Sequence, residues 1–325
     1  IGNNFCNLCF YGNSTINGSG GGIYTQGGVE LNNLNISNNT VNNNGGGIEI
    51  ESDNPIMISN CIINNNSSHY QGGGINLEDY GGEISIKNTS IINNVSSYEN
   101  YNGTGGGINV QGGSGNIKII ETQILNNTAY HAGGAINFHQ VGTPFLQNVI
   151  ISGNTSVLGP GAVRVFSSIV YFENLTVSDN VSSSGSVGGI SATNFGEAYI
   201  SNSIFYGNTP SQLEVSAPLE LNADIIKVEY SLIQGSEDDI AINNEFGELI
   251  WGSENIDANP LFTDATNGDY GLQNSSPAID VGNPNAFYND EDGSRNDMGY
   301  TGGNGISLSA TEFEFGYVGV GDSRN

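Results

Sequence analysis

The chain has 325 residues, of which 36% are hydrophobic, so it can bury the core of one or two domains. Its charge is one-sided, because 33 acidic residues stand against 6 basic ones and the formal net charge is −27. So few cations argue against nucleic acid and anionic lipid as partners, since both are bound mainly through Lys and Arg. The sequence has no apolar run of about 18 residues, so no membrane insertion is predicted.

An internal repeat is the first feature along the chain. A block of small residues followed by an aliphatic residue recurs, and its aliphatic positions are Ile23, Ile48, Ile75, Ile108, Ile136, Val163 and Ile190. Between these blocks lies a second motif, aliphatic-x-Asn-x-x-aliphatic-x-x-Asn. Its first polar position holds Asn7, Asn33, Asn60, Asn88, Glu121, Asn148, Asn174, Asn202 and Tyr230. Its second holds Asn13, Asn39, Asn66, Asn94, Asn127, Asn154, Asn180, Asn208 and Ser236. Copies that stay in phase like these indicate a solenoid.

The repeat predicts stacked strands. Segments such as 29–31 and 84–86 alternate apolar and polar residues, which is the pattern of a β-strand. The usual step of 27 residues is too short for a strand–helix–strand unit, which needs roughly 30 or more, and suits three short strands joined by turns. We therefore predict an all-β fold: a right-handed, single-stranded parallel β-helix of about nine coils over residues 1–236.

The repeated asparagines have a structural purpose at the bends. Asn tolerates left-handed backbone, and stacked amides can hydrogen-bond from one coil to the next. The residues predicted to form this structural ladder are Asn7, Asn33, Asn60, Asn88, Asn148, Asn174 and Asn202.

Two of the repeated words resemble those of a known family. The GGAI word at residues 133–136 and the FxxN words at residues 10–13 and 205–208 resemble the paired motifs of chlamydial polymorphic outer-membrane proteins. These motifs are also found in other bacterial right-handed β-helix surface proteins. The resemblance covers residues 1–236 and implies a secreted β-helix adhesin.

The composition changes after the repeats. Residues 214–325 hold 21 of the 33 acidic residues. Within residues 237–303, the words NPLF, SSPAID and DGSRNDMG are similar to the C-terminal closing segment of secreted bacterial β-helix proteins. We expect this acidic segment to complete the last coils and to cover the C-terminal end of the core, because a bare solenoid end exposes apolar surface and strand edges.

The two ends of the chain suggest self-association. The repeat motif is already present in the first residues, and the strand-like tail, residues 304–325, carries alternating aromatic residues. Such a tail could pack on its own solenoid or add to a neighbouring subunit. We expect a homo-oligomer that grows end to end into a filament. The residues assigned to this contact are Phe5, Phe10, Phe313, Phe315 and Tyr317.

One loop is the best candidate for an ion site. Asp290, Asp292, Asn296 and Asp297 place oxygen-bearing side chains around a glycine turn, as Ca²⁺ requires. The alternative is a turn in which Arg295 pairs with its own acidic neighbours. No other cofactor is predicted.

The remaining polar residues define no catalytic set. Glu49, Glu51 and Glu78 are expected on one strand face at neighbouring levels, as an acidic patch. His131 and His139 flank one strand, either as a metal pair or as surface turn residues. Because many β-helices act on polysaccharides, a lyase or glycoside hydrolase remains the alternative, and it would need two carboxylates in one groove.

The sequence thus favours an extracellular or cell-surface protein with a structural or adhesive function and no enzymatic activity. A glycan or a host-cell surface ligand is its expected partner, and a passive glycan-binding module is a further alternative. The three cysteines, Cys6, Cys9 and Cys61, allow a local disulfide or free thiols.

Overall fold

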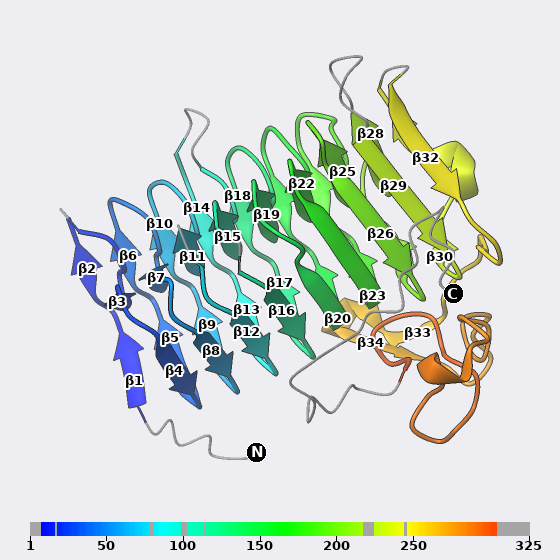
Figure 1. The fold of residues 1–325 in the computed structure, drawn as a ribbon, viewed down its shortest axis with the longest axis horizontal. Helices are drawn as coiled ribbons and strands as arrows, with labels where there is room; N and C mark the ends of the chain where they lie inside the picture. The colour runs from blue at the N-terminus through cyan, green and yellow to red at the C-terminus, as the bar shows by residue number, and fades with distance from the viewer. Residues whose placement is uncertain are drawn as a thin grey trace, which may run out of the picture.

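The computed structural model describes residues 8–16, 18–78, 81–98, 103–113, 115–216, 224–243 and 246–303. Figure 1 shows the chain wound into a stack of parallel coils, with strands of successive coils side by side. The predicted fold class is confirmed: the protein is an all-β parallel β-helix. Its described helical elements are short 3₁₀ turns, η1 (Ser236–Asp239), η2 (Ala265–Asn267) and η3 (Ala286–Tyr288).

Three parallel sheets form the sides of the solenoid. Sheet C holds β3 (Ile23–Thr25), β7 (Ile48–Glu51), β11 (Ile75–Glu78), β15 (Ile108–Gln111), β19 (Ile136–His139), β22 (Val163–Phe166), β25 (Ile190–Thr193), β28 (Leu213–Ser216) and β31 (Ala241–Ile242). Sheet B holds β2 (Ser14–Thr15), β6 (Thr40–Val41), β10 (Ser67–Ser68), β14 (Val95–Ser96), β18 (Thr128–Ala129), β21 (Thr155–Ser156) and β24 (Val181–Ser182). The nine described strands of sheet C bracket eight full turns, close to the nine coils predicted.

Sheet A has two strands in most coils, so the coil has one strand more than the sequence suggested. One row of this sheet holds β4 (Val29–Asn32), β8 (Ile56–Ser59), β12 (Ile84–Lys87), β16 (Ile117–Ile120), β26 (Glu197–Ser201), β29 (Asp224–Glu229) and β32 (Gly247–Trp251). The other holds β1 (Leu8–Tyr11), β5 (Leu34–Ser37), β9 (Ile62–Asn64), β13 (Ser90–Ile92), β17 (Gln123–Leu125), β27 (Ile204–Tyr206) and β30 (Leu232–Ile233). Two long strands run through both rows, β20 (Phe145–Ser152) and β23 (Ile169–Ser178).

The first asparagine position of the repeat forms the bend between these two rows. From Asn33 to Tyr230 every residue at this position is left-handed, with φ between 48° and 58°. An L-residue with a short polar side chain adopts this conformation most readily, which explains the preference for Asn. Asn7 lies outside the described residues.

The continuous amide ladder is formed by the second asparagine position. Each amide donates to the side-chain oxygen of the Asn one coil further on, as Asn94 Nδ2 does to Asn127 Oδ1 at 3.0 Å. The members are Asn13, Asn39, Asn66, Asn94, Asn127, Asn154, Asn180 and Asn208. In the set predicted for the ladder, Asn88 donates to Asn60 at 2.7 Å, but the later members bond elsewhere. The left-handed bend turns these side chains outward, whereas the second position faces the core.

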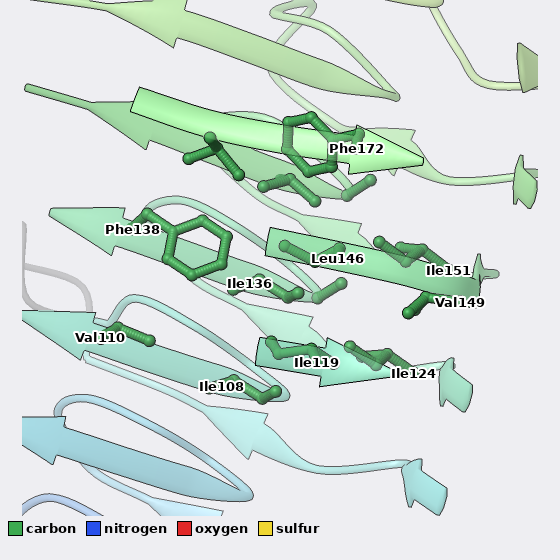
Figure 2. Close-up of a cluster of buried hydrophobic side chains, with 14 of the residues drawn as sticks. Ile108, Val110, Ile119, Ile124, Ile136, Phe138, Leu146, Val149, Ile151 and Phe172 are labelled. Atoms are coloured by element: carbon green, nitrogen blue, oxygen red, sulfur yellow. The ribbon is translucent and has the colours of Figure 1, made fainter. Parts of the chain in front are cut away.

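Aliphatic residues fill the interior in vertical stacks. Figure 2 shows Ile108 below Ile136, and Ile119 below Leu146 and Phe172, in the order set by the strand register. All five side chains are at most 1% exposed. Burying each contributes about 2–3 kcal/mol relative to leaving it exposed. The period-2 pattern of the sequence therefore determines which side of each strand faces inward.

Parallel pairing continues beyond residue 236, where the sequence suggested that the repeats end. β32 pairs with β29, and Ile256 forms a parallel bridge with Leu232. The pairing survives because Tyr230 keeps the left-handed bend although it replaces the usual Asn.

The closing segment, which we define as residues 257–303, lies along the side of the solenoid. It contains one antiparallel pair, β33 (Phe262–Asp264) and β34 (Asp269–Leu272), which lie near β20 and β23 in Figure 1. Its Met298 and Ala278 are buried against Ile204 and Leu232 of the solenoid. We expected residues 237–303 to complete the last coils and to cover the C-terminal end of the core. Residues 247–256 do add to the last coils, and residues 257–303 lie on the outward bend of the later coils, where apolar side chains and Asn amides contact them.

Residues assigned to self-association are only partly described. Phe10 in β1 is half-buried and packs against the core. Phe5, Phe313, Phe315 and Tyr317 lie outside the described residues. Cys9 is disulfide-bonded, whereas Cys61 is a buried free thiol whose pKa is raised by burial. None of the helices in the described ranges combines the length and the apolar character needed to cross a membrane.

Candidate cation-binding cleft

The closing segment and the solenoid enclose an acidic cleft of about 650 Å³. The solenoid contributes Glu121, Thr122, Gln123, Asn148 and Ile150. The closing segment contributes Ile279, Asp280, Asp290, Glu291, Asp292, Ser294, Asp297, Tyr300, Thr301 and Gly303. Six of these side chains are carboxylates, so the cleft collects much of the acidity of the closing segment.

Asn side chains at the first position of the repeat, on the bend between the two rows of sheet A, hold the closing segment against the solenoid. Asn148 Nδ2 donates to the carbonyl oxygens of Tyr300, at 2.9 Å, and Gly302, at 2.6 Å. One coil further on, Asn174 Nδ2 donates to Asn296 Oδ1 at 2.9 Å. The asparagines expected to stack on one another therefore bind the closing segment in this half of the molecule. A repeat motif does not predict this hydrogen bond, because its two partners lie more than 120 residues apart in the chain.

Three aspartates converge inside the cleft. Asp280, Asp290 and Asp297 each have a carboxylate oxygen within 4.8 Å of the others. Backbone groups orient them: Asp290 accepts from the N–H of Asp297 at 3.0 Å, and Asp297 accepts from the N–H of Asp280 at 2.7 Å. Sequence reasoning found Asp290 and Asp297 but missed Asp280, which stands ten residues earlier and outside the glycine turn.

Burial and nearby charges raise the pKa of two of these aspartates. Burial, together with the nearby charges of Asp290, Asp280 and Asp292, raises the pKa of Asp297 to about 6. Burial also raises the pKa of Asp290, and the negative charges of Asp292 and Asp280 add to this. Carboxylates that resist ionisation side by side are strong ligands for a divalent cation, because the cation removes the repulsion.

The other two predicted ligands lie apart from this group. Asp292 lines the cleft but is exposed. Its carboxylate accepts from the Ser294 hydroxyl at 2.5 Å and from the Ser294 N–H at 2.9 Å, and these two bonds lower its pKa. Asn296 is fully buried, and its Nδ2 donates to the carbonyl of Tyr288 at 2.6 Å. Its amide faces Asn174, so we do not retain it as a ligand. Arg295 donates to backbone carbonyls of Val281 and Gly282.

The solenoid wall adds two groups that face the cleft. Asn148 Oδ1 is shielded from solvent and, within the described ranges, has no hydrogen-bond partner. Glu121 replaces Asn at its bend and lies 3.4 Å from Lys87 Nζ. An amide oxygen and a carboxylate opposite three aspartates are the donor types that Ca²⁺ prefers.

The two histidines singled out in the sequence lie beside a cation. Burial lowers the pKa of both His131 and His139, and the charge of Arg164 lowers it further. His139 stacks on Phe166 with ring centroids 4.6 Å apart, and the Arg164 guanidinium lies 4.4 Å from the centre of the same ring. A positive charge at this position disfavours a metal ion there.

Comparison of the chain with protein-family models, with curated proteins and with solved structures gives no match.

Proposed function

We propose that this chain is an extracellular structural and adhesive protein, without enzymatic activity, whose closing segment is fastened to the solenoid by Ca²⁺. The observation that carries the proposal is the convergence of Asp280, Asp290 and Asp297 within 4.8 Å in the cleft. An ion at that point would neutralise carboxylates of the closing segment beside the solenoid wall, where Asn148 and Glu121 line the same cleft.

The exposure of the site supports an extracellular location. Asp280 is exposed, while Asp290 and Asp297 are partly buried, so the cleft is open to solvent. Extracellular Ca²⁺ modules have dissociation constants of roughly 10⁻⁴–10⁻³ M, and we expect this solvent-exposed site to bind in that range. The net charge of −27 supports the absence of nucleic acid among the partners.

Adhesion and self-association belong to the same proposal. A rigid stack of parallel coils offers long, regular faces to a glycan or to a cell-surface ligand. End-to-end association into a homo-oligomer stays a prediction, since most residues assigned to it are outside the described ranges.

Glycoside hydrolysis is the second candidate, and the same cleft favours it. Asp297, with a pKa of about 6, could donate a proton while a neighbouring carboxylate stays ionised. Calcium ranks first because the three aspartates converge on one point. A glycosidase needs its two carboxylates on either side of a scissile bond.

Calorimetry and thermal unfolding test the calcium proposal. We expect Ca²⁺ at about ten times its dissociation constant to stabilise the protein by about 1.4 kcal/mol and to raise Tm by roughly 2–4 °C. Ca²⁺ should also slow proteolytic cleavage within residues 257–303. Binding should weaken below pH 6, because protonation of Asp297 competes with the ion.

The matched variants are Asp297→Asn and Asp257→Asn, which remove the same charge. Asp257 is exposed and lies outside the cleft. Asp297→Asn should abolish the Ca²⁺ protection of the closing segment, and Asp257→Asn should retain it. Equal protection in both variants would exclude the cleft as the site, and release of reducing sugar from polysaccharides would favour the hydrolase.

A further inference from the structure

A second group of carboxylates lies on the outer side of sheet C, far along the chain from the cleft. Glu49 and Glu51 are in β7, and Glu78 is in β11, where it pairs in register with Glu51. One carboxylate oxygen of each lies within 4.8 Å of the other two. Among the described residues, no Lys or Arg forms an ion pair with any of them.

Neutral donors hold these carboxylates in position. Asn76 Nδ2 donates to Glu49 Oε1 at 2.9 Å and to Glu78 Oε1 at 3.0 Å. Tyr24 Oη donates to Glu51 Oε2 at 3.1 Å. These donors are neutral, so three acidic side chains converge with no positively charged side chain paired to them in the described part of the chain.

Glu49 supplies a second, independent observation at this cluster. Its side chain is 0% exposed, yet its Oε2 has no hydrogen-bond partner among the described residues. A Cβ at Gly45 would lie 2.6 Å from this oxygen and would clash with it, so the position of the carboxylate requires glycine there. A buried carboxylate oxygen without a partner is costly, and proteins normally satisfy such an atom with a donor or a metal ion.

We propose that Glu49, Glu51 and Glu78 form a binding site for a hard divalent cation of the Ca²⁺ class. Their oxygens are the ligand type that such an ion requires, and their convergence brings three of them to one point. The ion neutralises the charges of Glu51 and Glu78 and coordinates the buried oxygen of Glu49. This site is independent of the cleft and does not rest on the proposed function.

A proton on Glu49 is the competing explanation. Burial first, and then the charges of Glu78 and Glu51, raise the pKa of Glu49 to about 8, so the metal-free group is protonated at neutral pH. Metal binding must displace this proton, and the affinity therefore rises with pH.

Terbium luminescence distinguishes cation binding from protonation of Glu49. Tb³⁺ occupies Ca²⁺ sites and emits when a nearby tyrosine is excited, and Tyr24 touches Glu51. In the whole chain at pH 7, we expect saturable emission that Ca²⁺ displaces. Because Tyr300 lines the cleft and can also sensitise an ion bound there, the comparison is made in the Asp297→Asn background. There Glu49→Gln should lose most of the emission, by about tenfold or more, while Glu30→Gln, the same substitution at an exposed position outside the cluster, should retain it.

Two further variants separate the sources of the signal. In the same background, Tyr24→Phe should lose the emission but keep the rise in Tm that Ca²⁺ gives. Asp297→Asn by itself should keep the part of the emission that Tyr24 sensitises, because it alters only the cleft. Circular dichroism checks that each variant is folded. Emission that Glu49→Gln leaves unchanged, that Asp297→Asn abolishes, or that never saturates in the unmodified chain would overturn the proposal.

Discussion

At the scale of single residues, the polar groups buried in this solenoid have distinct purposes. Some, such as Asn127, satisfy hydrogen bonds in the coil stack. Others are acidic and lie among neutral donors, and Glu173 is the clearest case. It is 4% exposed and accepts from Ser201 Oγ at 2.5 Å and from Asn202 Nδ2. Asn202 Oδ1 also accepts from the N–H of Asn283, so Glu173 indirectly supports the closing segment.

The protonation of Glu173 should make stability depend on pH. Burial raises its pKa to about 7, although the hydrogen bonds from Ser201 and Asn202 act in the opposite direction. A carboxyl group whose pKa is raised in the folded protein stabilises the fold fully only below the pKa of the unfolded chain, about 4.5. This contribution to the free energy of unfolding is lost as pH rises through the folded pKa of about 7. Glu173→Gln should therefore be more stable than the parent by about 1–3 kcal/mol at pH 8 and nearly equal at pH 5. Urea denaturation at both pH values measures this.

Glu30→Gln is the control, because it removes the same charge from an exposed position. If it gains as much stability at pH 8 as Glu173→Gln does, relief of the general negative charge explains the effect and burial does not.

At the scale of elements, the closing segment depends on a small apolar contact. Met298 is 0% exposed and packs with Ile204, Leu232 and Ala278, apart from the main core. The amides of Asn148 and Asn174 add directional hydrogen bonds on the same side. A separate small cluster of this kind can open without unfolding the rest of the protein.

Met298→Ala should release the closing segment selectively. Loss of the buried side chain costs about 2–5 kcal/mol, which is enough to increase local opening. Hydrogen exchange should accelerate in residues 278–303 and stay slow in the amide ladder. Met57→Ala, at a side chain that is 47% exposed, should change neither. Uniform acceleration throughout the chain would show that the closing segment unfolds only together with the solenoid.

At the scale of the whole molecule, the amide ladder connects the coils from Asn13 to Asn208. Asn127 accepts two hydrogen bonds from Asn94, one from its backbone N–H and one from its side chain. It also donates to the carbonyl of Ile91 at 2.9 Å. All of these groups are buried, so removal of one amide leaves several without partners.

Asn127→Ala should destabilise the solenoid by about 3–5 kcal/mol, because each buried group left unpaired costs about 1–3 kcal/mol. Asn42→Ala, at an exposed position, should cost less than about 0.5 kcal/mol. The urea midpoints of the two variants give the comparison. A loss below about 1 kcal/mol for Asn127→Ala would mean that water or rearrangement replaces the ladder bonds.

The sequence by itself determined the solenoid. Its periodic aliphatic residues specify which face of each strand is buried, and its asparagines mark the bends, because these are local preferences repeated in every coil. The loop around Asp290 and Asp297 could be identified as a cation candidate for the same reason: its oxygens are close in sequence.

Only the tertiary structure decided which of these groups meet. Asp280 joins Asp290 and Asp297, and Asn296 leaves the predicted set, because the closing segment folds back on the outward bend. The repeat motif separates the two asparagine positions, but it does not reveal that one stacks while the other binds a distant segment. Contacts between residues far apart in the chain depend on how whole coils pack. A repeat of about 27 residues describes one coil and does not predict those contacts.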